Sequence, residues 1–400
     1  MGLCGLARAG RGRTALEWTA EALARGEDAG ANQVVRQAPL LPGVHVAGGR
    51  ERGDLPGFLA DSLPDSWGRL LVDRLLRARG VEPASLTGLD RLAIVGDRGP
   101  GALGYEPDVP LSRPLDGAVD LDSLAADAEI VLTGREPELL DRLVQAGGSA
   151  GGSRPKAWIA EDGAGGLRSG AGPLRVGETG WLVKFRAPDH DPKDVGPLEF
   201  AYARMASAAG LEVAEPRLFQ GRQGRYFGSR RFDRDGPRRI HVLTAAALLD
   251  VAPEQALAAD YADLLKLTRH VTRSEGEAVE AYRHAVFNVL AHNRDDHLKQ
   301  FAFRRLSGVW RRTPAYDLLF NEGPGDEHTL LVAGEGRRPG PEHLVRLAAL
   351  AGIKAAAARD VVERVRDAVA RFEDFAGGAG VSAATTDAVA ERLGIGRTRA

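Results

Sequence analysis

The chain has 400 residues, of which 44% are hydrophobic, and it carries 53 basic and 55 acidic side chains. This length allows two or three domains with cores of their own, and the near balance of charge excludes a strongly basic nucleic-acid-binding protein. The single cysteine, Cys4, excludes an internal disulfide and a cysteine-built zinc site. Because neither a long apolar run nor an export signal is present, we expect a cytoplasmic protein without membrane spans.

The N-terminal part of the chain carries only weak patterns before its first clear helix. We expect no order over residues 1–10 and a helix over 16–23. A stronger helix begins at Pro64 and ends at Gly80, because apolar residues recur on one face. These residues are Trp67, Leu70, Leu71, Leu75 and Ala78. The segment 92–95, Leu-Ala-Ile-Val, is typical of a strand that leads into glycine-rich turns.

Short strand patterns dominate the middle of the chain. Strands are expected at 157–160, 181–185 and 226–232, and a helix is expected from Pro197 to Gly210. The short strands and the glycine-rich turns between them predict an antiparallel sheet.

Helical patterns dominate the rest. Two helices are expected within 253–292, and alanine-rich helices within 342–375. Between them, strands at 301–303 and 309–310 flank a Ser-Gly turn, which predicts a hairpin.

These elements divide the chain into three parts and predict an α+β fold. Residues 1–115 form a small α/β subdomain, residues 116–245 form a lobe with an antiparallel sheet, and residues 246–400 form a helical lobe. No internal repeat is found at a solenoid period.

The strongest chemical signal is the segment 293–300, Asn-Arg-Asp-Asp-His-Leu-Lys-Gln, at the junction of a buried helix and the hairpin. Phosphoryl transfer to a hydroxyl needs a carboxylate that receives the proton and oxygen ligands that hold magnesium against the phosphates. In protein kinases a metal-binding amide follows the base by five residues, and Gln300 stands five residues after Asp295. A metal-binding aspartate follows one hairpin later, where Asp317 falls. This spacing favours a kinase site.

Two other interpretations of the same cluster stay open. Asp295 and Asp296 could cap a loop while His297 fills a polar niche. Alternatively, His292, Asp296 and His297 could hold a transition metal in a phosphohydrolase, although no further His or Asp cluster stands at a recognisable spacing.

Lys184 alternates with Trp181, Val183 and Phe185, so its side chain is expected on the other face of the strand, where a cation can reach phosphates. An ordinary solvent-facing lysine is the alternative. Glu199, on the next helix, is a candidate to pair with Lys184, as kinase lysines pair with a helix glutamate.

The glycine-rich segment 146–156 can bring backbone amides close to phosphate, because its glycines carry no side-chain bulk. It lacks the spacing that ends in Gly-Lys-Ser/Thr, which disfavours a P-loop ATPase. A flexible linker is the alternative interpretation.

In their order along the chain, these segments resemble the HipA family, the serine/threonine kinase toxins of bacterial type II toxin–antitoxin systems. The resemblance covers most of the chain, and it implies a two-lobed protein-kinase-like fold with a small N-terminal subdomain. The matching segments are 57–65, 149–156, 182–185, 231–234, 295–299 and 314–318.

Residue by residue, the resemblance implies that Asp295 is the catalytic base, that Asp317 and Gln300 bind magnesium, and that Lys184 holds the ATP phosphates. Gln300 stands where the family usually has Asn, and Arg230 stands where the adenine hinge commonly has an acidic residue. The other ATP-binding residues that the resemblance implies are Ser149, Ala150, Gly151, Gly152, Ser153, Arg231, Phe232, Asp233, His297 and Lys299.

The resemblance also implies an activity and partners. The activity is ATP- and magnesium-dependent phosphorylation of a protein, with aminoacyl-tRNA synthetases among the family's substrates. Autophosphorylation of Ser149 is expected to silence the kinase, because a phosphate adds nearly two negative charges beside the ATP site. A small helix-turn-helix antitoxin is expected to bind the chain and to provide its only contact with DNA. The alternative is a pseudokinase that binds nucleotide or antitoxin without phosphoryl transfer, which the substitutions at Gln300 and in the hinge would mark.

Overall fold

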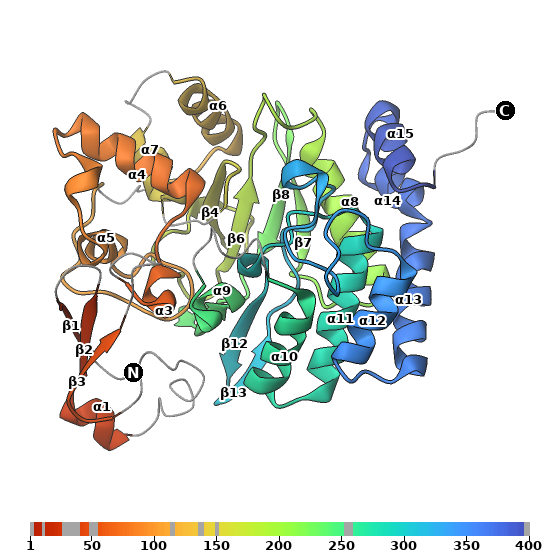
Figure 1. Cartoon of the computed structure of the whole chain (residues 1–400). Coiled ribbons are helices and arrows are strands. Elements are labelled where there is room, and N and C mark those ends of the chain that lie inside the picture. The colour runs from red at the N-terminus through yellow and green to blue at the C-terminus, as the bar shows by residue number, and fades with distance from the viewer. Residues whose placement is uncertain are drawn as a thin grey trace.

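The computed structural model describes residues 4–9, 13–25, 41–47, 55–112, 117–134, 140–148, 152–251 and 259–395. Figure 1 shows a small N-terminal sheet at the lower left, a larger sheet in the centre and a helical lobe at the right. This arrangement confirms the α+β class and the two lobes beside a small N-terminal subdomain. The boundaries near residues 115 and 245 stay predictions.

The N-terminal subdomain begins with a three-stranded antiparallel sheet. Its strands are β1 (Cys4–Arg8), β2 (Thr14–Trp18) and β3 (Val44–Ala47), and the helix α1 (Ala20–Arg25) follows β2. The expectation of disorder over residues 1–10 is therefore wrong for β1, and the helix expected over 16–23 is wrong for its first part. In β2, Thr14 and Leu16 are buried two positions apart, which is the period of a strand.

Three helices follow: α3 (Gly57–Ala60), α4 (Ser66–Ala78) and α5 (Gly88–Val95). The helix expected from Pro64 to Gly80 is confirmed as α4. The strand expected at 92–95 is wrong, because these residues form the last turn of α5. A capping box begins that helix, in which Asp90 N donates to Thr87 Oγ1 at 3.2 Å and Thr87 N donates to Asp90 Oδ2 at 2.8 Å.

The expected antiparallel sheet is confirmed as a five-stranded sheet with the strand order β5-β4-β6-β8-β7. The strands are β4 (Lys156–Glu161), β5 (Leu167–Ser169), β6 (Thr179–Lys184), β7 (Pro216–Gln220) and β8 (Arg225–Arg230). One face packs against α4, α6 (Leu121–Leu132) and α7 (Leu140–Gly147) in an apolar cluster. Figure 1 places these helices together beside β4.

The helix α8 (Val195–Ala208) joins this sheet to the helical lobe, since Tyr202 and Met205 belong to the same core as Tyr282 and Phe287. The lobe contains α10 (Tyr261–Thr272), α11 (Glu275–Leu290), α12 (Pro341–Leu350), α13 (Ala355–Val369), α14 (Phe372–Ala379) and α15 (Ala383–Arg392). Among the described residues, no helix is long and apolar enough to cross a membrane.

The expected hairpin is confirmed as β12 (Ala302–Leu306) and β13 (Val309–Arg312), which form a small sheet with β11 (Val242–Thr244). Its two turn residues, Ser307 and Gly308, both have a positive φ, as the tightest hairpin turns require. The helix α9 (Ala245–Leu249) follows β11, and the 3₁₀ turn η4 (Leu298–Gln300) precedes β12. The candidates Gln300 and Asp317 therefore flank this hairpin in the sequence, and Asp317 contacts Lys184 at the end of β6.

Candidate active site

A pocket lies where the three parts of the chain meet. Its apolar wall contains Phe58, Leu63, Leu103, Trp158, Leu182, Phe227, Val242 and Leu243. Nine of the expected site residues also line it: Gly152, Lys184, Arg231, Phe232, Asp233, His297, Lys299, Gln300 and Asp317. Ser153 and Asp295 are not among the lining residues, and Ser149, Ala150 and Gly151 lie outside the described residues.

Lys184 lies at the centre of the charged part of this pocket. Its ammonium group contacts the carboxylates of both Glu199 and Asp317. Lys184 is 8% exposed and Glu199 is 2% exposed, so these charges are stabilised by one another rather than by water. Burial alone would lower the pKa of Lys184, but Asp317 and Glu199 raise it above its ordinary value. The strand alternation has thus placed a buried cation in the pocket, and α8 supplies Glu199 as its partner.

Asp317 and Gln300 form the oxygen-rich end of the pocket. Gln300 Nε2 donates to Asp317 Oδ2 at 2.6 Å, and Asp317 adopts a φ of +56°, a conformation that is uncommon outside glycine. Although burial acts to raise the pKa of Asp317, the neighbouring Lys184 and Lys156 hold it well below its usual range. Carboxylate and carboxamide oxygens are the ligands that magnesium takes. Asp317 and Gln300 therefore fit this ion, provided that the Gln300 carboxamide turns its oxygen toward it.

Asp295 and Asp296 are adjacent but have different environments. The Asp295 side chain is 45% exposed, and its Oδ1 lies 3.8 Å from His297 Nε2. Burial raises the pKa of Asp295, which makes it a better proton acceptor than an ordinary carboxylate. Asp296 is fully buried and accepts hydrogen bonds at 2.7 Å from Tyr261 Oη, His328 Nδ1 and Thr329 N.

Because Asp296 accepts these hydrogen bonds from the protein, it is not free to bind a metal ion, as the metal-phosphohydrolase interpretation requires. Within the described ranges, no group of three or more His, Cys, Asp or Glu residues could hold a metal ion. The arrangement of His292, Asp296 and His297 therefore gives no support to a transition-metal centre.

Lys156 and Asp65 belong to the site but were not singled out from the sequence. Lys156 lies directly opposite Lys184 in the β4–β6 register, and burial lowers its pKa to about 8. Asp65 begins α4, accepts a hydrogen bond from Gly152 N, and lies 2.8 Å from Lys299 Nζ. The alternation of β4 could have indicated Lys156, but no local pattern indicates Asp65, because its partners are distant in the sequence.

Arg231 and Asp233, two of the expected ATP-binding residues, form an ion pair at the edge of the pocket. Arg231 donates to both carboxylate oxygens of Asp233, at 2.9 and 2.8 Å, and its guanidinium lies 4.0 Å from the centre of the Trp158 ring. Gly101 N also donates to Asp233, at 2.9 Å. Burial acts to raise the pKa of Asp233, but Arg231 and Arg234 hold it at about 2. Arg231 and Asp233 therefore act as a fixed structural pair that joins the sheet to the N-terminal subdomain.

Gly152 is one of the described glycines of the segment 146–156. It has a φ of +90°, and a Cβ atom there would collide with the Lys156 ammonium group. The positive φ therefore favours glycine at this position.

Comparison with known proteins identifies the family. Residues 4–106 match the HipA N-terminal domain, and residues 148–372, more than half of the chain, match the HipA-like C-terminal domain. A curated relative, "Putative kinase Y4dM" of Sinorhizobium fredii, is 26% identical over 210 residues. That alignment covers 48% of this chain and 50% of the relative, so it spans only half of the relative's length.

A solved structure extends the likeness to the whole fold. HipA of Shewanella oneidensis MR-1, determined in a complex with HipB and its operator DNA, superposes with a TM-score of 0.71 at 17% sequence identity. The match covers 99% of this chain and 93% of that protein. With both family domains matched in order, and the fold shared from end to end, the chain belongs to the HipA family.

Proposed function

We propose that this chain is an ATP- and magnesium-dependent serine/threonine protein kinase. The observation that carries the proposal is the buried contact of Lys184 with both Glu199 and Asp317, next to Gln300 and the Asp295 loop. A lysine on a strand, its glutamate partner on a helix and a metal-binding aspartate are the parts that position a phosphoryl group in protein kinases.

The residues of the pocket have distinct roles in this proposal. Lys184 and Lys156 attract the phosphates, while the apolar wall accommodates the adenine. Magnesium, held by Asp317 and Gln300, supplies neutralisation of phosphate charge. Asp295 orients the acceptor hydroxyl and receives its proton. Its exposure of 45% leaves it within reach of a protein substrate.

We further propose that the kinase is the toxin of a toxin–antitoxin pair. The support is membership of the HipA family and the Shewanella neighbour, which was determined with HipB and operator DNA. A helix-turn-helix antitoxin would bind this chain and link it to DNA. An aminoacyl-tRNA synthetase is the candidate substrate, and Ser149 is the candidate site of autophosphorylation.

The test is phosphoryl transfer from radiolabelled ATP with magnesium, using the unaltered protein, Asp295→Asn and Asp317→Asn. Asp263→Asn is the matched control, because this exposed carboxylate on α10 contacts only Lys266 among the contacts described for its side chain. Transfer should fall to background in the two site variants and persist in the control. Transfer that survives both site substitutions would contradict the assignment of the site.

The same samples separate the alternatives. ATP binding without transfer, together with activity gained in Gln300→Asn, would favour the pseudokinase. Release of free phosphate by a protein with a bound transition metal would favour the phosphohydrolase. A phosphopeptide that disappears in Ser149→Ala would support autophosphorylation at that residue, and its persistence would contradict it.

A further inference from the structure

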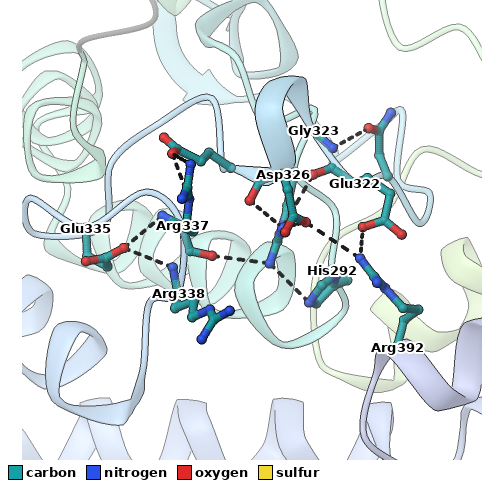
Figure 2. Close-up of polar contacts among 11 residues, drawn as sticks. His292, Glu322, Gly323, Asp326, Glu335, Arg337, Arg338 and Arg392 are labelled. Carbon is teal, nitrogen blue, oxygen red and sulfur yellow. Dashed lines mark hydrogen bonds and ion pairs between the residues drawn. The ribbon is translucent and has the colours of Figure 1, made fainter.

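The segment 321–338, between Asp317 and α12, is fixed to the catalytic loop by a network of charged side chains. Apart from the short 3₁₀ turn η5 (Pro324–Asp326), it has no helix, and it contains several exposed charges. Figure 2 shows Glu322, Asp326, Glu335, Arg337 and Arg338 in one network of polar contacts, with His292 and Arg392 joining it from other elements.

Arg294, the residue immediately before the proposed base, makes several contacts of this network. Arg294 is 6% exposed, and its Nη1 donates to the Asp326 carboxylate at 2.5 Å and to the Asp326 carbonyl at 2.8 Å. Its Nη2 donates to the Arg337 carbonyl at 3.3 Å and lies 3.4 Å from His292 Nε2. The planar guanidinium can bind several acceptors in fixed directions at once, which a lysine cannot do. One side chain therefore holds both ends of the segment.

Backbone and carboxylate contacts join both neighbours of Asp295, Arg294 and Asp296, to the segment 321–338. Arg294 N donates to the Asn321 carbonyl at 3.2 Å, and Thr329 Oγ1 donates to the Arg294 carbonyl at 3.1 Å. On the other side, Asp296 accepts from Thr329 N and His328 Nδ1, each at 2.7 Å. Asp295 itself makes no comparable contact in the described residues, so its neighbours determine its position.

The last helix reaches the same segment. Arg392, near the end of α15, contacts the Glu322 carboxylate and lies 3.6 Å from Asp326 Oδ1. The Arg392 side chain is 47% exposed. Solvent-exposed ion pairs contribute little on their own, but this pair adds to an anchor that Arg294 already holds in place.

We propose that Arg294 is a positioning residue for Asp295, acting through Asp326, and that Arg392 latches the segment 321–338 from α15. The inference rests on the proposed kinase function and adds how its catalytic loop is held. In kinases whose activation loop is ordered by phosphorylation, an arginine pairs with the added phosphate. Here a permanent carboxylate, Asp326, fills that role, so the segment is ordered without modification.

The first measurement is hydrogen–deuterium exchange, which does not depend on activity. In Arg294→Ala, the amides of 328–332 should exchange at least about tenfold faster, because the buried guanidinium loses its contact with the exposed Asp326 carboxylate and with two carbonyls. Asp326→Asn should give a smaller increase, and Arg392→Ala an increase of about two- to threefold, whereas no increase in Arg392→Ala would rule out the latch. Arg269→Ala, which removes a bidentate pair with Glu275 in the same lobe, should leave these amides unchanged.

The second measurement is phosphoryl transfer by the same variants. Arg294→Ala should lower kcat by about tenfold or more while the Kd for ATP changes by less than about twofold, because Arg294 does not line the pocket. Arg294→Lys should recover part of kcat. In a double-mutant cycle, the effects of Arg294→Ala and Asp326→Asn should be strongly non-additive.

Two outcomes would overturn the inference: exchange of 328–332 in Arg294→Ala that matches Arg269→Ala, or equal losses of ATP binding and kcat. If the unaltered protein transfers no phosphate, the kinase proposal fails. The exchange measurement still decides whether Arg294 and Arg392 hold the segment.

Discussion

The two faces of the five-stranded sheet have different roles, although the same strands build both. On one face, Ile159, Trp181 and Val183 pack against α4, α6 and α7 in an apolar cluster. On the other face, Lys156 and Lys184 point into the pocket beside Leu182. The alternation of β4 and β6 separates these sets residue by residue. A substitution of one residue can therefore affect the stability or the chemistry of the protein, depending on its face.

The largest expected effect is on the packed face. Trp181→Ala should lower the free energy of unfolding by about 3–5 kcal/mol, because it removes a large buried side chain and leaves a cavity. Trp181 is 4% exposed, and its ring lies 5.5 Å from that of Phe219. Urea denaturation measures the loss, and kcat per folded molecule should hardly change. A large fall in kcat for the folded fraction would contradict the separation of the two faces.

On the pocket face, Lys184→Met should lower kcat by about 10²–10³-fold, the usual cost of removing one electrostatic contact to a reacting group. The free energy of unfolding should fall as well, because this single substitution leaves Glu199 and Asp317 without their buried cation, so kcat is measured per folded molecule. Transfer assays and urea denaturation on the same preparation provide the comparison. If kcat per folded molecule changes as little in Lys184→Met as in Trp181→Ala, the pocket face does not carry the chemistry.

The charge of Lys156 depends on pH, which provides a further test of the pocket face. Its pKa of about 8 means that it is charged at pH 7 and increasingly neutral above pH 8, chiefly because it is buried. The KM for ATP should therefore rise by up to about tenfold between pH 7 and pH 9, as the charged fraction falls. Lys156→Arg should remove this rise, because arginine keeps its charge throughout. An unaltered protein whose KM is flat over this range would show that Lys156 does not contact phosphate.

The smallest effect is expected at Gln300. Gln300→Asn should lower the magnesium concentration for half-maximal activity by about threefold, which corresponds to less than about 1.4 kcal/mol of binding free energy. The shorter side chain would bring its oxygen closer to the usual position of this ligand. A titration of transfer rate against magnesium measures the shift. A higher magnesium concentration for half-maximal activity in the variant would mean that Gln300 is already the better ligand in this pocket.

Short apolar runs between glycine-rich turns made the central sheet predictable, whereas the N-terminal part of the chain has no such clear pattern. Strands at 157–160 and 181–185 were predicted because both are short, mostly apolar runs on either side of a glycine-rich turn. The four apolar residues at 92–95 fit a strand and a helix equally well, and only the capping box at Thr87 distinguishes them. The strand β1 has no clear strand pattern in its sequence. It is ordered because it pairs with β2, a contact that the local sequence does not indicate.

The site was predictable where a motif carries the chemistry and unpredictable where the fold creates the contact. Lys184, Asp295 and Asp317 were found from spacing and from family resemblance. Asp65 lies 234 positions from Lys299 in the sequence, so their contact depends on the packing of α4 against the rest of the fold. Arg294 was visible in the sequence, but its acceptors at Asp326 and Arg337 were not.

The opposed lysines of β4 and β6 have a thermodynamic consequence. Like charges directly opposite on neighbouring strands destabilise a sheet, and Lys156 faces Lys184 in this register. An anion bound between the two lysines would remove that repulsion. Because the anion binds only the folded protein, its binding would raise the free energy of unfolding. A polyphosphate should therefore raise the melting temperature of this protein, even when no phosphoryl group is transferred.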